Sequence, residues 1–571
     1  MTQRMTGSEA LVEALRAEGV EHVAGIVGSA FMDPLDLFPQ AGIRFVQVRH
    51  EQSAALMAEG YGRASGRPGV CIGQNGPGIT NLVTGVASAY LNHTPVVVLT
   101  PAVLTSAIGT RAFQEIDQMR LLAPVVKWQM QVNRSDRMGE AIRGAFRAAV
   151  ALRGPVQVDI PRDTYYGEWD EPELPPARYR TDGRFGGAPR QAVQQAAQLL
   201  AAARHPVILA GLGVVEADAR AEVERLAQAL GAPVACVWLH NDAFSADHPW
   251  GLGPIGYQGS EAAMRVLARA DAVLVLGSRL NAFGTTPQYG IDFFPAGAKL
   301  IHNSIDPLEI GALRPIDVGL VGDCGEVAAQ LAEALRGHLP PFDVAARQAE
   351  VAAEKAAWDA KLRALSLVDT DPIAPRRALW EIAQAVPDDV SVCADVGNVS
   401  GACNAYFTAQ RHTRRFFGAG SLGGIGVGYP TALGVKLARP EAPVLALGGD
   451  GAWSMTLQEV MTAVTEKIPL VAVVFNNGVY GAERRNQFDF YGERYFYTDL
   501  DNPSFAEVAG VMGAHAVRVK RADAIGPALR EAFACGRAAV VEIDVDPKAL
   551  NEPYRRDALK APRSTMARYA R

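Results

Sequence analysis

Three features that would assign the chain to other protein classes are missing or scarce. Its 571 residues contain only six cysteines and no Cys-x-x-Cys pair, which argues against a zinc site or a disulfide framework and is typical of a reducing cytoplasm. No apolar run approaches the length needed to cross a bilayer. The net charge is only −6, so neither a nucleic acid nor an anionic membrane is expected as a partner.

The composition is that of a globular protein, with 49% hydrophobic and 20% charged residues. The length predicts roughly three or four domains. Short apolar runs alternate with helical patterns, which indicates doubly wound α/β domains. We predict three such domains and a basic tail, at residues 1–166, 191–339, 372–546 and 547–571.

Two connections separate the predicted domains. Residues 168–190 are rich in proline, glycine and charge, and are predicted to be a linker. Residues 344–365 are rich in alanine, lysine and glutamate, and are predicted to be a bridging helix. The first and third domains share one winding plan, as two related halves would.

An aspartate between two glycines follows a predicted buried strand. Val444–Leu447 is apolar and leads to Asp450, a helical pattern follows, and Leu470–Phe475 predicts a second buried strand that ends beside Asn477. Because the carboxyl ends of parallel strands share one edge of a sheet, Asp450 and Asn477 are expected side by side. A carboxylate and an amide oxygen suit a magnesium ion that bridges a phosphate. The alternative is an ordinary turn followed by an amide pair.

An acidic residue opens a predicted helix in the N-terminal domain. A strand is expected to end at Val48 and a helix to begin near Glu51, with Ala54 and Ala55 on its apolar side. An acid in the first turn is favoured by the helix dipole alone. The functional alternative is a carboxyl group that contacts a cofactor.

Two glycine-containing segments are predicted to approach a ligand with their backbones. Gly420–Pro430 reads GSLGGIGVGYP, and so many glycines indicate close backbone approach. Its apolar residues, Ile425 among them, argue against a structureless connector. Ala394–Gly401 follows a strand and is predicted to cradle a diphosphate with the N–H groups of Asn398 and Val399.

Two further stretches are candidates for the substrate side of a site. Ile72–Asn81 contains a Gly/Asn turn in which Asn75 could face a substrate. Ala107–Asp117 contains Phe113 and Gln114. For both stretches, loop structure with amide caps explains the pattern about as well as function does.

Taken together, these motifs resemble the thiamine diphosphate (ThDP) enzymes of the acetolactate synthase and pyruvate oxidase branch. The resemblance covers nearly the whole chain, and within the branch several longer strings are more similar to sulfoacetaldehyde acetyltransferases. Those strings are Gly28–Gln52, Gly69–Asn81, Gly253–Met264, Gly277–Gly290, Gly481–Arg494, Leu500–Phe505 and Arg555–Lys560. They are more specific than the Gly-Asp-Gly turn, because the fold alone does not demand them.

The resemblance implies a cofactor site shared between the N-terminal and C-terminal domains. Asp450, Asn477 and the carbonyl of Val479 would hold Mg²⁺, and Glu51 would face N1′ of the aminopyrimidine ring of ThDP. A bulky residue would press the cofactor into its bent shape, and a glycine carbonyl would accept from its 4′-amino group; by motif these are Ile425 and Gly423. The remaining implied cofactor-binding residues are Gly397, Asn398, Val399, Gly449, Gly451 and Ala452.

The implied reaction converts sulfoacetaldehyde and phosphate to acetyl phosphate and sulfite, and no flavin is expected in the central domain. Both substrates are anions, so cations or N–H groups must face the site. Arg111, Arg484 and Arg485 are candidates by position, with solvated arginine as the alternative. Phe113 and Gln114 match a Phe-Gln pair of acetolactate synthases, and Gln114 is predicted to be catalytic. The other predicted substrate residues are Ser29 and Asn75.

Two segments resemble acetolactate synthases more than sulfoacetaldehyde acetyltransferases: Gly109–Ala112 and Gly420–Gly428. Both lie near the predicted substrate side, so the alternative activity is that of an acetolactate synthase-like 2-oxo acid decarboxylase or carboligase. A catalytically inactive subunit of the same fold would need an essential group to be missing, whereas Glu51, Asp450 and Asn477 are all present.

The resemblance also implies an assembly. Glu51 must meet a diphosphate held by the C-terminal domain, and in these enzymes the two come from different subunits. A homodimer or homotetramer with active sites between subunits is therefore expected, located in the cytoplasm.

Overall fold

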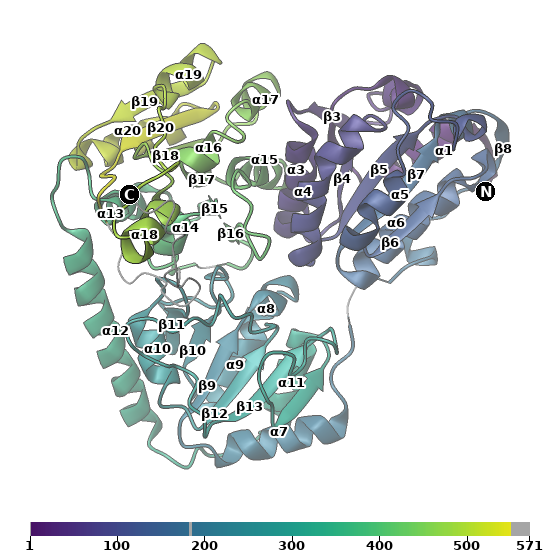
Figure 1. Ribbon diagram of the computed structural model, residues 1–571. Coiled ribbons are helices and arrows are strands. Elements are labelled where there is room, and N and C mark those ends of the chain that lie inside the picture. Colours follow the sequence, from purple (N-terminus) through teal and green to yellow (C-terminus); the bar gives the residue numbers. More distant parts are fainter. Residues whose placement is uncertain (1, 182–184, 411, 550–571) are drawn as a thin grey trace, which may run out of the picture.

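Three sheets of six parallel strands each organise the chain into three lobes (Figure 1). The computed structural model describes residues 2–181, 185–410 and 412–549. The predicted tail beyond residue 549, with the string Arg555–Lys560, lies outside the described residues. The doubly wound α/β fold predicted from the sequence is confirmed.

The first and third sheets have the same winding order. The N-terminal sheet runs β3 (Arg44–Gln47), β2 (His22–Gly25), β4 (Gly69–Ile72), β5 (Val96–Ala102), β7 (Pro155–Pro161), β6 (Trp128–Gln131). The C-terminal sheet runs β16 (Phe416–Gly418), β15 (Ser391–Ala394), β17 (Val444–Gly449), β18 (Val471–Asn476), β20 (Ala539–Asp544), β19 (His515–Val519). The shared plan that the sequence predicted is therefore present.

The central sheet has a different order. It runs β11 (Gly251–Pro254), β10 (Val234–Cys236), β9 (Pro206–Ala210), β12 (Ala272–Leu276), β13 (Lys299–Ser304), β14 (Val318–Val321). Every residue of β9 and β12 is buried. Helices cover both faces of a sheet of this kind, which is why its inner strands are continuous apolar runs.

Helices connect the strands in each domain. The N-terminal domain contains α1 (Gly7–Ala17), α2 (Met32–Leu37), α3 (Glu51–Ser65), α4 (Pro77–Leu91), α5 (Gln118–Leu122) and α6 (Met138–Leu152). The central domain contains α7 (Arg190–Ala202), α8 (Leu212–Glu216), α9 (Arg220–Leu230), α10 (Glu261–Leu267) and α11 (Cys324–Ala334), and is followed by the bridging helix α12 (Val344–Ser366). The C-terminal domain contains α13 (Pro375–Ala385), α14 (Asn398–Cys403), α15 (Gly428–Ala438), α16 (Asp450–Trp453), α17 (Glu459–Thr465), α18 (Gly481–Phe490), α19 (Phe505–Val511) and α20 (Ile525–Ala534). No helix in the described part of the chain is long and apolar enough to cross a membrane.

The segment predicted to be a linker begins with a strand instead. Glu168–Pro172 forms β8, which pairs antiparallel with β1 (Thr2–Thr6) at the start of the chain. The sequence suggested a linker because this segment is charged and ends in proline. Edge strands of a small sheet tolerate both features, so the linker assignment was wrong for these five residues.

The N-terminal and C-terminal domains share one hydrophobic core, in which α3 lies against α15 (Figure 1). Two glycines permit the close approach. A Cβ added to Gly60 would lie 2.2 Å from the carbonyl oxygen of Thr431, and one added to Gly434 would lie 2.0 Å from that of Met57. Residues larger than glycine would therefore push the two helices apart.

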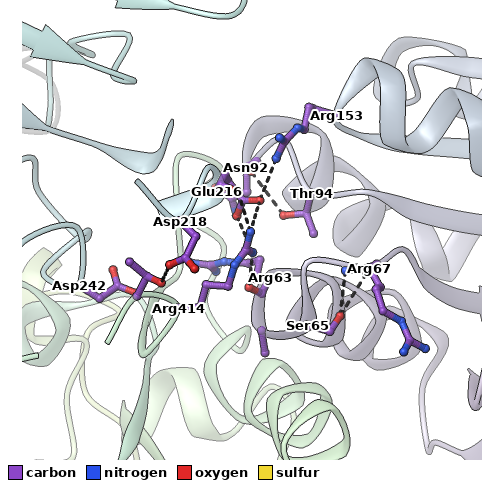
Figure 2. Close-up of polar contacts among 12 residues, drawn as sticks. Arg63, Ser65, Arg67, Asn92, Thr94, Arg153, Glu216, Asp218, Asp242 and Arg414 are labelled. Carbon is purple, nitrogen blue, oxygen red and sulfur yellow. Dashed lines mark hydrogen bonds and ion pairs between the residues drawn. The ribbon is translucent and has the colours of Figure 1, made fainter. Parts of the chain in front are cut away.

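A largely buried ion-pair cluster joins all three domains (Figure 2). Arg414 of the C-terminal domain donates to the carbonyl of Arg63 in the N-terminal domain at 2.9 Å and to the carboxylate of Glu216 in the central domain at 3.3 Å. Arg153 of the N-terminal domain donates to the same carboxylate at 3.2 Å. Dissolved salt screens buried charges less than exposed ones. These ion pairs therefore help to fix how the three domains are oriented relative to one another.

Candidate active site

The predicted site residues follow neighbouring strands at the carboxyl edges of two sheets. In the C-terminal sheet β15 and β17 are adjacent; β17 is followed by the predicted Asp450 and β15 by Asp395, which was not predicted. In the N-terminal sheet β2 and β4 are adjacent, and they are followed by the loops that carry Ser29 and Asn75. At each of these places the strand order reverses, which is where doubly wound folds bind ligands.

The carboxylate of Asp450 is buried and accepts hydrogen bonds at both of its oxygens. Its Oδ2 accepts the N–H of Gly478 at 2.7 Å, the N–H of Asn477 at 3.2 Å and the side-chain amide of Asn502 at 2.9 Å. Its Oδ1 accepts the N–H of Gly451 at 2.9 Å. Burial raises the pKa of Asp450, and these hydrogen bonds oppose the shift. The predicted side-by-side placement of Asp450 and Asn477 is confirmed.

The predicted metal donors are oxygens of the kind that Mg²⁺ prefers. Asn477 contributes an amide oxygen, which here accepts the N–H of Val479 at 3.1 Å, and Val479 contributes a carbonyl. One carboxylate, one amide and one carbonyl fit a divalent cation, which would also offset the cost of burying the charge of Asp450. Within the described ranges no group of three or more His, Cys, Asp and Glu side chains could hold a metal. A metal here would therefore depend on the amide and the carbonyl.

The helix predicted after the Gly-Asp-Gly turn is divided into α16 and α17. The chain turns between them because Met455 and Thr456 donate to carbonyls three residues back, at 3.2 and 3.1 Å, in place of the four-residue α-helical spacing. The second helix thereby leaves the turn and packs against the N-terminal domain.

Asp395 holds the loop that carries Ile425. Its Oδ1 accepts the N–H groups of Val396 at 2.7 Å and Gly426 at 2.9 Å, and its Oδ2 accepts the N–H of Gly428 at 2.7 Å. Burial raises the pKa of Asp395 to about 6, against the opposing effect of these hydrogen bonds. The glycine-rich loop is therefore fixed immediately after Ile425.

Three of the predicted cofactor glycines border open space. A Cβ added to Gly397, Gly423 or Gly449 would meet no atom of the described residues within 4 Å. The φ angles of Gly397 and Gly423 are 130° and 66°, which other residues rarely adopt. Gly451 differs, because an added Cβ would lie 2.5 Å from the ring of Tyr480. The open space beside the first three glycines leaves room for a group that approaches the backbone closely.

Glu51 is the first residue of α3, and only 7% of its surface is exposed. Its Oε2 accepts the side-chain amide of Asn81 at 2.9 Å. A Cβ added to Gly78 would lie 3.1 Å from Oε1, and one added to Gly73 would lie 3.4 Å from Cγ. The helix dipole explains an acid at this position but not its burial between two glycines, so the carboxyl group is held in one orientation.

An amide network brings three of the predicted substrate-side stretches together. Gln74 accepts the N–H of Ala30, the neighbour of Ser29, at 3.2 Å. It donates to Oδ1 of Asn75 at 2.6 Å and to Oε1 of Gln114 at 3.0 Å. Asn75 in turn donates to the carbonyl of Gln114 at 3.2 Å.

The loop that carries Arg111 and Phe113 is exposed in the single chain. Phe113 is 88% exposed, and Arg111 is exposed with a φ of 62°. The carboxylate of Glu115 closes the loop by accepting the N–H groups of Gly109 and Ala112. The loop thus has an internal support, while its large side chain has no cover from the described residues.

The two predicted arginines of α18 have partners within the chain. Arg484 pairs with Asp499 at 2.5 Å and lies over the ring of Tyr495 at 4.1 Å. Arg485 is buried and pairs with Asp489 at 2.8 Å. Of the two guanidinium groups, that of Arg484 is the more accessible to a substrate.

A cavity of about 710 Å³ lies where the three domains meet. It is lined in part by Gly397, Asn398 and Gly423. Among the described residues Glu51 and Asp450 do not line it, so the predicted site is not one closed cavity of the single chain. Of the other cofactor positions, Val399 packs against the core of the C-terminal domain and Ala452 is buried in α16.

Three protein-family models match the chain in order. They describe the thiamine pyrophosphate enzymes: the N-terminal TPP binding domain at residues 5–121, the central domain at 193–331 and the C-terminal TPP binding domain at 395–543. The chain belongs to the thiamine pyrophosphate enzyme family. Thiamine pyrophosphate is ThDP, so ThDP is the cofactor, and its two binding domains carry Glu51 and Asp450.

Relatives within this family match nearly the whole chain. The sulfoacetaldehyde acetyltransferase of Alcaligenes xylosoxydans xylosoxydans is 44% identical, and that of Castellaniella defragrans is 43% identical; both matches cover 99% of this chain and 97% of the relative. A probable acetolactate synthase large subunit of Methanocaldococcus jannaschii is 35% identical over 95% of this chain and 92% of its own.

The structure also shows residues that sequence reasoning did not assign. Asp395 carried the same signal as Asp450, an acid directly after a buried strand in a glycine-containing turn. Asn81 and Gln74 lay inside a string that was quoted for the resemblance, without a role. Asn502 contacts a residue 52 positions away, and no local pattern predicts such a pair.

Proposed function

We propose that this protein is a ThDP-dependent acyltransferase that converts sulfoacetaldehyde and phosphate to acetyl phosphate and sulfite. The observation that carries the proposal is the 44% and 43% identity to two sulfoacetaldehyde acetyltransferases over 99% of the chain. Acetolactate synthase large subunits are less similar, at 35%.

In this proposal the C-terminal domain holds the diphosphate end of the cofactor. Asp450, Asn477 and the carbonyl of Val479 would hold Mg²⁺, which would offset the negative charge of the diphosphate. The open space beside Gly397 and Gly449, the buried carboxylate of Asp450 and the hard-oxygen donors support this assignment. The other backbone contacts to the diphosphate are made by Asn398, Val399, Gly451 and Ala452.

The N-terminal domain supplies the acid. Glu51 would hold a proton at N1′ of the aminopyrimidine, Ile425 would pack against the cofactor, and the carbonyl of Gly423 would accept from its 4′-amino group. When bound, ThDP would supply a nucleophilic carbon for addition to the aldehyde and for transfer of the acetyl group to phosphate. The burial of Glu51 and the hold of Asp395 on the loop of Ile425 support these roles.

The substrate side holds two anions. Arg111 and Arg484 are the more accessible candidates, whereas Arg485 is buried and pairs with Asp489 within α18. Gln114 acts as the catalytic amide that orients the aldehyde oxygen, and Phe113 excludes water once it is covered. The remaining proposed contacts are Ser29 and Asn75. The bond from the N–H of Ala30 to Gln74 and the bond from Asn75 to the carbonyl of Gln114 support this grouping.

We further propose that the active form is a homodimer or homotetramer with its sites between subunits. Within the described ranges the carboxylates of Glu51 and Asp450 have separate partners, and Phe113 is left exposed. The proposed domains span 1–166, 191–339 and 372–546, with β8 added to the first. All six cysteines lie in the described part and are free thiols, which favours a cytoplasmic location.

The test is an incubation with sulfoacetaldehyde, phosphate, ThDP and Mg²⁺, followed by quantification of sulfite and acetyl phosphate. We expect both products in equal amounts. Bound ThDP is measured in the same sample by native mass spectrometry. Absence of sulfite from the loaded protein would overturn the proposal, and release of carbon dioxide from pyruvate would assign an acetolactate synthase-like activity in its place.

A further inference from the structure

A buried glutamate of the C-terminal domain contacts the segment that leads into Glu51. Glu459 is the first residue of α17, and none of its surface is exposed. Its Oε1 and Oε2 accept the N–H of Arg49 at 3.2 and 3.1 Å. Thr462, one turn further along α17, donates its hydroxyl to Oε2 at 2.6 Å. The carboxylate therefore holds the backbone two residues before Glu51.

The contact belongs to a row of residues along one face of α17. The hydroxyl of Thr462 also lies 3.4 Å from the carbonyl of Gln47. Glu466, a further turn along, accepts the N–H of Gln47 at 3.2 Å and pairs with Arg44 at 3.0 Å. Residues at this spacing share one helix face, so α17 covers the edge strand β3 and the junction that follows it.

Packing alone does not account for a carboxylate at this position. Burial raises the pKa of Glu459, so the fold loses free energy by keeping it ionised there. An apolar residue of similar size would avoid that cost, whereas it could not accept the N–H of Arg49. A buried carboxylate that lowers stability is expected where it fixes the direction of a backbone segment.

The connectivity gives this contact a functional meaning. Helix α17 follows the turn that carries Asp450, and Arg49 precedes Glu51, so within one chain Glu459 joins the helix after the metal turn of one proposed site to the segment that carries the acid of the neighbouring site. We propose that Glu459 is a positioning residue, which sets the orientation of the Glu51 carboxyl group by fixing the entry of the chain into α3. This inference rests on the role of Glu51 proposed above.

The first test is Glu459→Gln, which keeps the size of the side chain and removes its charge. Hydrogen exchange of the amides in residues 47–53, measured without cofactor, should become about tenfold faster, because a charge-assisted hydrogen bond is lost. The kcat for sulfite release should fall about tenfold to hundredfold, with KM for phosphate unchanged, because a misplaced catalytic group acts on the chemical step.

The matched control is Glu466→Gln on the same helix face. It loses contacts to β3 and leaves the N–H of Arg49 bound, so the exchange of residues 49–53 and kcat should both stay at wild-type values. Equal effects of Glu459→Gln and Glu466→Gln would indicate a general loss of the interface, and the positioning role would be wrong.

A double-mutant cycle separates this inference from the proposed role of Glu51. Because Glu459 acts through Glu51, Glu459→Gln should lower kcat in the wild-type background and leave it unchanged in a Glu51→Gln background. Full activity of Glu51→Gln alone would overturn the role of Glu51. Additive losses in the double variant would overturn the positioning role of Glu459 and leave that of Glu51 intact.

Thr462→Val provides a second variant if Glu459→Gln does not fold. It removes the hydroxyl that orients the Glu459 carboxylate and keeps the volume of the side chain. Faster exchange at residues 49–53 together with a smaller loss of kcat is expected. Wild-type exchange and wild-type kcat in this variant would contradict the inference.

Discussion

The cofactor side and the substrate side of the proposed site differ in how much of their structure a single chain supplies. Asp450 is buried and accepts hydrogen bonds from three backbone N–H groups and one side-chain amide, and Glu51 is buried against Asn81. Phe113 is 88% exposed and Arg111 is exposed beside it. The fold thus preorganises the groups that we propose to hold the cofactor, whereas the loop that we propose to meet the substrate is left exposed, as expected if a substrate or a second subunit covers it.

The largest expected effect on this comparison comes from Glu51→Gln. We expect kcat for sulfite release to fall by about 10²–10⁴-fold, because a positioned acid–base group contributes that much. The affinity for ThDP and the melting temperature should be unchanged, since glutamine keeps the shape and can still accept the amide of Asn81. Steady-state assays, calorimetric titration and thermal unfolding measure the three quantities.

Glu21→Gln, on the surface of the same domain, is the control for that variant and should retain full activity. If Glu51→Gln turned over sulfoacetaldehyde at the wild-type rate, the acid would not belong to the cofactor side.

The next effect concerns the metal turn. Asp450→Ala should weaken ThDP binding about tenfold to a hundredfold, because it removes the only charged donor of the proposed Mg²⁺ site. A chelator should have a similar effect on the wild-type protein, and added Mg²⁺ should reverse it. Titration calorimetry with and without Mg²⁺ measures both changes. Asp523→Ala, which breaks an exposed ion pair with Arg521, should leave ThDP affinity unaltered.

A ThDP affinity of Asp450→Ala equal to that of the wild type, with the same dependence on Mg²⁺, would remove the metal from this turn.

A smaller effect is expected for Asp395→Asn. Asparagine offers one acceptor oxygen and no charge to the N–H groups of Gly426 and Gly428, and a hydrogen bond to a charged group contributes about 1.5–3 kcal/mol. ThDP affinity should therefore fall about tenfold, and the amides of residues 426–430 should exchange faster. Unchanged exchange in this loop would show that the carboxylate does not hold it.

The smallest effect is expected on the substrate side. Arg111→Ala should raise KM for sulfoacetaldehyde about fivefold, because an exposed ionic contact contributes only about 1 kcal/mol. ThDP affinity should stay at the wild-type value, as it should in the control Arg120→Ala on α5. If Arg111→Ala also lowered the affinity for ThDP, Arg111 would not belong to the substrate side alone, and the distinction between the two sides would be wrong.

The sequence predicted those parts of the fold that local patterns encode. The predicted strands Val444–Leu447 and Leu470–Phe475 correspond to β17 and β18, and Asp450 and Asn477 meet because each directly follows one of these buried parallel strands. Strand periodicity and the rule for parallel sheets were sufficient for these results.

The contacts that fix the site residues could not be predicted from strand periodicity or from the rule for parallel sheets. Asn81 reaches Glu51 across 30 positions, and Gly428 reaches Asp395 across 33, through the packing of separate elements. Glu459 lay inside the predicted helix after the Gly-Asp-Gly turn, and only the three-dimensional packing shows that its side chain meets the other domain. Long-range pairs of this kind have no spacing rule in a single sequence.

One measurement tests most directly whether Glu51 and Asp450 serve the same coenzyme from different subunits. Glu51→Gln and Asp450→Ala subunits are dissociated, mixed in equal amounts and reassembled, and sulfite release is assayed at a ThDP concentration that loads native sites and leaves Asp450→Ala sites empty, so that each variant alone has little activity. In a shared site one of the two sites of each mixed dimer carries both native residues, so activity should return to about a quarter of the wild-type value. No recovery in mixtures that demonstrably contain mixed dimers would contradict the account.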